Sequence, residues 1–99
     1  MLSNYNSLIV PLILSGVSHF GMYTAGEEVN INCVDSHETA EQVEWLNSTG
    51  TVLIFSLSSV VTLTIDTITD EHHGLDYTCR IRSSGTIHDI SYNIIVLGN

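Results

Sequence analysis

The stretch GLDYTCRI, residues Gly74 to Ile81, is the most informative part of the sequence, because it sets a tyrosine two residues before a cysteine. The chain has one other cysteine, Cys33, and its single tryptophan, Trp45, lies between the two. Polar and apolar residues alternate through the stretch, which is the period of a β-strand with one buried face. Tyr77 and Cys79 are therefore predicted to point inward together.

Strand signals of the same kind recur along the chain, and no segment shows sustained helical periodicity. The segments predicted as strands are residues 27–34, 41–46, 51–57, 59–66, 75–82 and 87–97. The apolar run LIVPLIL, residues 8–14, fits a first strand at a sheet edge, because Pro11 would remove a ladder hydrogen bond from a central strand. Turn residues separate these runs, as in NSTG at 47–50 and SSGT at 83–86. Short alternating strands with one apolar face each predict an all-β fold, in which two antiparallel sheets pack face to face as a sandwich.

The composition limits the size and the partners of the protein. Its 99 residues, 43% of them hydrophobic, predict a single folded domain over residues 1–99 with a core from about 8 to 97. Eleven acidic residues against Arg80 and Arg82 give a formal net charge of −9. Binding to nucleic acid or to anionic lipid needs clustered basic side chains, so we expect neither as a partner. A neutral or basic protein partner is compatible with this charge, and no apolar run is long enough to insert into a bilayer.

The alternation places Cys33 and Cys79 on the inward faces of strands that are far apart in the sequence. A disulfide between them would join one sheet to the other and would stabilise the fold by about 4 kcal/mol, because it restricts the unfolded chain. Trp45, inward on a strand between them, would pack its ring against the sulfur atoms. The Tyr77 ring would be buried beside Cys79, with its hydroxyl turned back to a backbone group at the preceding corner.

These residues resemble the signature of the immunoglobulin superfamily. The resemblance lies in Gly26-Glu27 before Cys33, in Trp45 after it, and in Tyr77-Thr78-Cys79. The run VTLTIDTITDEHHGLDYTC is similar to the family's apolar strand, acidic corner and tyrosine corner. The resemblance covers nearly the whole chain and implies an inter-sheet disulfide, with Trp45, Leu63 and Tyr77 as core residues. The alternative is an unrelated sandwich with two free buried cysteines.

Two departures from the family pattern narrow the resemblance. His73 stands where the family often has an aspartate, and no arginine precedes Arg80, so the family's usual ion pair is not expected. The interval from Trp45 to Leu63 leaves room for one short strand, and not for the extra hairpin of antibody variable domains. The sequence therefore resembles the shorter sets found in cell-surface adhesion molecules and receptor ectodomains. This implies one domain of a larger, membrane-anchored parent protein.

No catalytic or cofactor chemistry is predicted for this segment. The densest polar cluster consists of Asp70, Glu71, His72 and His73. Neighbouring residues on a corner rarely converge on one ion, so a solvated corner is favoured over a zinc or calcium site. The sequence also lacks the nucleophile motif of a hydrolase. We therefore expect no enzyme, no cofactor and no metal site here, although a kinase elsewhere in the parent protein is compatible with the sequence.

Asn47-Ser48-Thr49 is an N-glycosylation sequon in a predicted turn, where the modifying enzyme can reach Asn47. A disulfide between Cys33 and Cys79 would also favour an oxidising compartment. Both features predict an extracellular or cell-surface location, with Asn47 as the glycosylation site.

Domains of this family commonly bind partners through the sheet that carries the last two strands and the tryptophan strand. The outward residues predicted as a candidate interface on this sheet are Glu44, Leu46, Val52, Ile54, Arg80 and Arg82. The apolar members would form an exposed patch rimmed by charge, which is typical of protein interfaces. A neighbouring domain or a glycan that covers the patch is the alternative. Glu44 is expected to face one of the arginines as an exposed ion pair.

The sequence thus predicts an extracellular protein-recognition module of an adhesion molecule or receptor. Its partner would be another protein, including a second copy of the same domain. One alternative is a ligand-binding or spacer domain in the ectodomain of a receptor tyrosine kinase. The other is a structural spacer in a modular, muscle-type array, for which two free thiols would be expected in an intracellular setting.

Overall fold

The computed structural model describes residues 4–10 and 18–98. Within these ranges the strands are β1 (Asn4–Val10), β2 (Ser18–Thr24), β3 (Val29–Asp35), β4 (Gln42–Leu46), β5 (Val52–Ser56), β6 (Val60–Ile65), β7 (Asp76–Ser83) and β8 (Thr86–Leu97), and a short 3₁₀ helix, η2 (Asp70–His72), precedes β7. The strands β3 to β8 lie where the alternation predicts strands, within about two residues at each end. No helix in the described part of the chain has the length and hydrophobicity needed to cross a bilayer.

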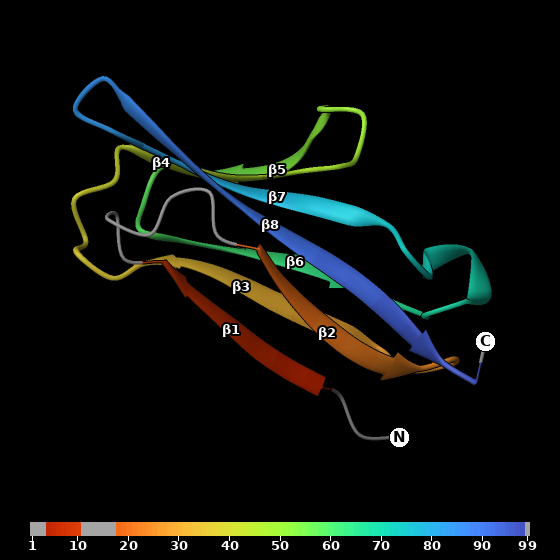
Figure 1. Cartoon of the computed structure of the whole chain (residues 1–99). Helices are drawn as coiled ribbons and strands as arrows, with labels where there is room; N and C mark the ends of the chain where they lie inside the picture. Colours follow the sequence, from red (N-terminus) through yellow and green to blue (C-terminus); the bar gives the residue numbers. More distant parts are fainter. Residues whose placement is uncertain (1–3, 11–17, 99) are drawn as a thin grey trace.

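The strands form two sheets that face each other as layers (Figure 1). One sheet has three strands in the order β1-β3-β6, and the other has five in the order β2-β8-β7-β4-β5. The pairs β3–β6, β4–β5, β4–β7 and β7–β8 are antiparallel, so the predicted all-β sandwich is confirmed. The N-terminal strands differ from the prediction, because β1 runs parallel to β3 and β2 runs parallel to β8. No hairpin joins either strand to its neighbour in the sheet, so no tight turn fixes its direction.

β1 occupies a sheet edge, as predicted for the apolar run at residues 8–14. It begins earlier than expected, at Asn4, and its first four residues are the polar sequence NYNS. These residues pair with β3 through the backbone. A hydrophobic pattern does not predict such pairing. The second half of the predicted strand, residues 11–14, lies outside the described residues.

β2 is a strand that the sequence analysis does not predict. Its apolar residues Phe20 and Met22 are 62% and 56% exposed, while Tyr23 is buried. This is nearly the reverse of the usual alternation, in which apolar side chains face the core. Pairing with β8 holds the strand in place, and the Tyr23 hydroxyl forms a buried hydrogen bond of 2.6 Å with the Tyr92 hydroxyl.

The tyrosine pair explains why residue 21 is glycine. A Cβ atom at Gly21 would overlap with the hydroxyl oxygens of both Tyr23 and Tyr92. We expect Gly21→Ala to lower the free energy of unfolding by about 1 to 3 kcal/mol, because two buried rings must move. Urea denaturation measures this change. The double variant Gly21→Ala/Tyr92→Phe removes the nearest overlapping atom and should recover part of the loss, and a Gly21→Ala protein as stable as the wild type would contradict the explanation.

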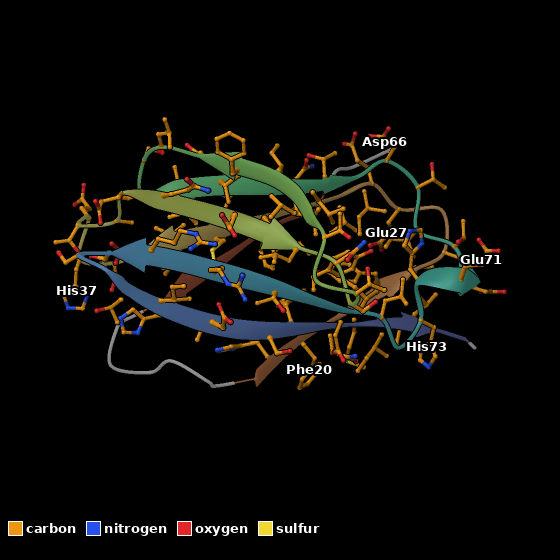
Figure 2. The ribbon with its side chains drawn as sticks, turned by 90° about the horizontal axis from the view of Figure 1, so that it is seen from above. Phe20, Glu27, His37, Asp66, Glu71 and His73 are labelled. Carbon is orange, nitrogen blue, oxygen red and sulfur yellow. A yellow bond between two sulfur atoms is a disulfide. The ribbon has the colours of Figure 1, made fainter. Side chains whose placement is uncertain are left out.

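The core lies between the sheets, around the Cys33–Cys79 disulfide that joins β3 to β7 as predicted (Figure 2). The Cα atoms of the two cysteines are 5.8 Å apart. Trp45 is fully buried opposite Cys79 in the β4–β7 ladder, and its ring meets the Tyr92 ring edge-on with centroids 6.3 Å apart. Leu63 and Tyr77 are buried in the same cluster. A cross-link and a large aromatic side chain therefore hold the two sheets together.

The prediction that the Tyr77 hydroxyl bonds a backbone group at the preceding corner is wrong. Within the described residues it makes no such hydrogen bond, and the burial of the ring raises the pKa of Tyr77. The backbone amides of His73 and Leu75 already donate to carbonyl groups inside the corner. We therefore expect Tyr77→Phe to change the free energy of unfolding by less than about 0.5 kcal/mol.

Tyr92→Phe is the matched comparison for Tyr77→Phe, because it removes the hydroxyl that bonds Tyr23. It should cost about 1 kcal/mol, the usual net value of one hydrogen bond. Urea midpoints of the two variants test the difference. A loss at Tyr77→Phe as large as the loss at Tyr92→Phe would mean that the corner bond exists in solution.

The β7–β8 hairpin sets the register at the centre of the five-stranded sheet. Ser84 and Gly85 have positive φ angles of 51° and 77°, as a two-residue turn of type I′ requires. The strands therefore pair Ser83 with Thr86, and further along the same ladder Arg80 with Asp89. The turn predicted from SSGT thus decides which charged side chains meet on the outer face of this sheet.

Candidate functional site

The outer face of the five-stranded sheet carries both basic side chains of the protein, in two rows that cross the strands. In the first row, Phe55 of β5, Glu44 of β4, Arg80 of β7 and Asp89 of β8 are neighbours in register. In the second row, Gln42 of β4, Arg82 of β7 and Ile87 of β8 are neighbours. We call these two rows the outer sheet face.

Glu44 is the centre of the outer sheet face. Its side chain is 1% exposed, and its two carboxylate oxygens accept hydrogen bonds from Arg82 Nε and Nη2 at 3.3 Å each. Gln42 Nε2 donates another bond at 2.6 Å, and Arg80 Nη1 lies 4.0 Å from Glu44 Oε2. A buried carboxylate needs such partners to offset the loss of hydration.

The prediction that Glu44 forms an exposed pair with one arginine is therefore wrong. Glu44 is buried and lies within ion-pair distance of both Arg80 and Arg82. Alternation along the strand correctly places the three side chains on the outer side of the sheet. It does not report that the guanidinium groups of two arginines on the neighbouring strand both lie within ion-pair distance of the buried carboxylate.

Arg80 is held from its other side by Asp89. Its Nε donates to Asp89 Oδ1 at 2.8 Å and its Nη2 donates to Asp89 Oδ2 at 3.0 Å. These bonds raise the pKa of the Arg80 guanidinium above its ordinary value, and attraction to the Asp89 and Glu44 charges acts in the same direction. Bidentate pairing also fixes the plane of the guanidinium group. Asp89, Arg80, Glu44 and Arg82 thus form one continuous charge network.

The charge network is neutral in a strongly acidic protein. It contains two of the eleven acidic residues and both basic residues, so the other nine acidic residues carry the whole net charge of −9. Residues 45–65, which include β5 beside the network, contain no charged side chain. A partner protein that is itself acidic therefore meets less repulsion at this face than over the rest of the surface.

Two exposed apolar side chains flank the charge network. Phe55, at the β5 end of the first row, is 58% exposed, and Ile87, at the β8 end of the second row, is 50% exposed. Ile87 and Arg82 line an open cavity of about 440 Å³, and its other lining residues are Glu41, Gln42, Leu57, Gly85 and Thr86. Aromatic and arginine side chains next to apolar surface are enriched in protein interfaces. The outer sheet face is therefore suited to contact with another protein.

Leu46 does not belong to an exposed patch on this face, contrary to the prediction. Its exposure is only 3%. The β4–β5 ladder shifts its register between Trp45 and Leu46, so that Leu53 is an extra residue on β5. The extra residue changes which side chains of β5 stand opposite Glu44 and Trp45.

The same register shift changes which β5 residues face outward. Ile54 pairs with the inward residue Trp45, and Phe55 pairs with Glu44. Phe55, and not Ile54, therefore shares the outer sheet face with Glu44. Val52 and Ile54 are exposed, at 45% and 43%, because β5 is the edge strand of its sheet.

The predicted interface did not include four members of the outer sheet face, namely Gln42, Asp89, Phe55 and Ile87. The positions of Asp89 and Ile87 were predictable from the sequence. A two-residue turn at SSGT pairs them with Arg80 and Arg82 when the ladder is counted back from the turn. The position of Phe55 was not predictable, because no signal in the sequence marks the extra residue on β5.

In the polar corner before β7, the two histidine side chains accept hydrogen bonds from backbone amides. His72 Nδ1 accepts the Thr69 amide at 2.9 Å at the start of η2, and His73 Nδ1 accepts the amide of buried Val96 at 3.0 Å. Figure 2 shows Glu71 and His73 at this end of the molecule. Among residues 4–10 and 18–98, no three His, Cys, Asp or Glu side chains come together in a way that could hold a metal ion.

Asn47 lies in the turn between β4 and β5, where Ser48 and Thr49 are exposed. Its side-chain oxygen accepts hydrogen bonds from the Thr49 amide at 3.1 Å, the Thr49 hydroxyl at 2.8 Å and the Thr51 amide at 2.9 Å. These bonds do not use the side-chain nitrogen, which is the atom that a glycan would join. The turn is compatible with glycosylation at Asn47, which stays a prediction.

Immunoglobulin domains are the solved structures that this fold matches. The second immunoglobulin domain of the mouse polymeric immunoglobulin receptor matches with a TM-score of 0.61 and 14% identity, over 83% of this chain and 98% of that chain. A complex of titin M10 with an obscurin-like 1 immunoglobulin domain matches with a TM-score of 0.57 and 20% identity, over 85% and 90%. A strand-swapped dimer of mouse leukocyte-associated immunoglobulin-like receptor 1 matches with a TM-score of 0.53 and 15% identity, over 88% of each chain.

No protein-family model and no curated protein matches the sequence. At the identities found, likeness to solved structures establishes the fold alone, and it confirms the fold that the resemblance implies. The similar folds come from receptors and from a titin complex alike, so the likeness does not decide between a recognition domain and a spacer.

Proposed function

We propose that this immunoglobulin-fold domain is a recognition module that binds another protein through its outer sheet face. The observation that carries the proposal is the charge network, in which the buried Glu44 carboxylate and Asp89 hold both basic side chains of the chain on one sheet. Two arginine side chains that are already fixed lose little conformational entropy on binding. Phe55 and Ile87 supply exposed apolar surface beside them.

The proposed setting is the outside of a cell, where residues 1–99 serve as one domain of a membrane-anchored parent protein. The Cys33–Cys79 disulfide supports this setting, because such bonds persist mainly in oxidising compartments. The sequon at Asn47 supports it as well, since it lies in an accessible turn outside the outer sheet face. In this setting a glycan at Asn47 leaves the charge network free for a partner.

The experiment applies the biotinylated domain, assembled into tetramers on streptavidin, to intact cells of the organism that encodes it. Tetramers make weak binding measurable, because several sites engage at once. We expect binding that disappears when the cells are first treated with protease. We expect Ile87→Asp to weaken it at least about tenfold, which corresponds to ~1.4 kcal/mol.

Val60→Asp is the matched control for Ile87→Asp. Both positions hold an exposed β-branched residue on a strand, 43% exposed at Val60 and 50% at Ile87, but Val60 lies on β6 of the three-stranded sheet. Val60→Asp should leave binding within about twofold of the wild type. An equal loss at both positions, or binding that survives protease treatment, would contradict the proposal.

A further inference from the structure

β5 is an edge strand whose apolar side chains are exposed on both of its faces. Val52, Leu53, Ile54 and Phe55 follow one another, and their exposures are 45%, 45%, 43% and 58%. β5 pairs with β4 along one edge, and none of the described strands pairs with its other edge. Natural edge strands are usually protected by charged side chains, by proline or by a β-bulge, because an open backbone edge is a template for another strand. β5 contains no charged side chain and no proline, and the bulge at Leu53 is the one such feature that it carries.

The two strands on this side of the molecule carry no charged side chain of their own. No charged side chain occurs between Glu44 and Asp66, and this segment contains both β5 and β6, the two strands that end their sheets on this side. The cavity beside them is lined by Leu53, Ile54, Thr62, Leu63 and Thr64. In a protein with a net charge of −9, this uncharged edge is where two copies approach each other with the least repulsion.

The opposite edge of the five-stranded sheet differs from β5. Its strand β2 exposes Phe20 and Met22, while Tyr23 between the sheets is buried. Figure 2 shows Phe20 on this side of the molecule, across the sheet from β5. β2 therefore offers apolar contacts on one face only, whereas β5 offers them on both.

We propose that β5 is a self-pairing strand, through which two copies of the domain join edge to edge about a two-fold axis perpendicular to the sheet. Antiparallel pairing about such an axis is self-complementary, so the open backbone edge of each copy supplies the hydrogen-bond partners of the other. Pairing centred on Ile54 places Leu53 of one copy beside Phe55 of the other, and such cross-strand apolar pairs stabilise a ladder. Because β5 is uncharged and apolar, a second copy of the same strand is complementary to it.

The dimer would present two outer sheet faces side by side on one continuous sheet. Edge contacts bury little surface, so the dimer is weak on its own. On a cell surface it would bring two recognition faces together and raise their combined affinity. The inference does not depend on the proposed function, because self-pairing uses the backbone edge of β5 and leaves the charge network uncovered.

The test is sedimentation equilibrium of the purified domain from about 10 μM to about 1 mM, a range that spans weak dissociation constants. We expect a reversible monomer–dimer equilibrium in the wild type. Phe55→Lys should raise the dimer dissociation constant at least about tenfold, because a lysine on an edge strand opposes pairing. Phe20→Lys is the matched control: it replaces the other phenylalanine, 62% exposed on β2, with the same change in charge, and it should alter the dissociation constant by less than about twofold.

Salt and hydrogen exchange complete the test on the unmodified protein. Added salt should strengthen the dimer, since it screens the repulsion between two acidic copies, whereas a dimer held by the arginines would weaken. Backbone amides of β5 should gain protection from exchange as the concentration rises, and amides of β2 should not. A wild type that stays monomeric at the highest concentration, equal effects of the two lysine variants, or protection confined to β2 would each overturn the proposal.

Discussion

Reduction of the Cys33–Cys79 disulfide is expected to lower the free energy of unfolding by about 4 kcal/mol. The two cysteines are separated by 46 positions in the sequence, so reduction releases a long loop and increases the entropy of the unfolded chain. A domain of this size has a total stability of about 5 to 15 kcal/mol, so the reduced protein should unfold at a much lower urea concentration. Urea denaturation followed by tryptophan fluorescence, with and without reductant, measures the shift.

The double variant Cys33→Ala/Cys79→Ala is the control for nonspecific effects of the reductant. It should be destabilised to a similar degree, and reductant should leave its midpoint unchanged. The intact mass of the native protein provides a second check, because a disulfide removes two hydrogen atoms. A native mass with two free thiols, or a wild-type midpoint that does not respond to reductant, would contradict the cross-link and would favour an intracellular spacer.

Replacing both arginines, Arg80→Met/Arg82→Met, is expected to destabilise the protein by about 3 to 5 kcal/mol. The Glu44 side chain is 1% exposed, so the double variant leaves a buried carboxylate with Gln42 as its remaining side-chain partner among the described residues. Methionine keeps an unbranched apolar stem at each position, so the loss reports the missing charges more than a loss of packing. Equilibrium unfolding at neutral pH measures it.

The triple variant Glu44→Leu/Arg80→Met/Arg82→Met tests the cause of this loss. It removes the stranded carboxylate, and apolar replacements of a whole buried ionic cluster are often neutral or stabilising. We expect it to recover most of the stability. Asp89→Asn is the matched control, because Asp89 pairs with Arg80 from a position whose side chain is 43% exposed, and it should cost less than about 1 kcal/mol. A triple variant as unstable as the double variant would show that Glu44 is not the source.

Much of the fold was predictable because its strongest signals are local. Cys33, Trp45 and Cys79 lie on strands with clear alternation, so their inward positions follow from the sequence pattern alone. β2 was not predictable in this way. It exposes Phe20 and Met22 and is held by backbone pairing with β8 and by the bond between Tyr23 and Tyr92, which are long-range contacts.

The candidate site was predictable in position but not in its chemistry. Period-two alternation points Glu44, Arg80 and Arg82 away from the core, and the family resemblance assigns their strands to one sheet. The structure confirms that the three side chains lie together. Glu44 is buried and bound by arginine side chains from a neighbouring strand, and Leu46 is 3% exposed although alternation places it outward. The alternation along a strand predicts the face on which a residue lies, whereas the burial of its side chain depends on residues of the neighbouring strand.

The most direct test of the binding surface is a substitution scan of exposed positions on both sheets, with the domain displayed on cells. Each variant is scored twice, once for folding by the amount displayed and once for binding to the protease-sensitive partner surface. We expect substitutions that lose binding but keep folding to fall at Phe55 and Ile87. Losses confined to the three-stranded sheet, at positions such as Val60 and Thr64, or spread evenly over both sheets, would contradict the claim that the outer sheet face is the binding surface.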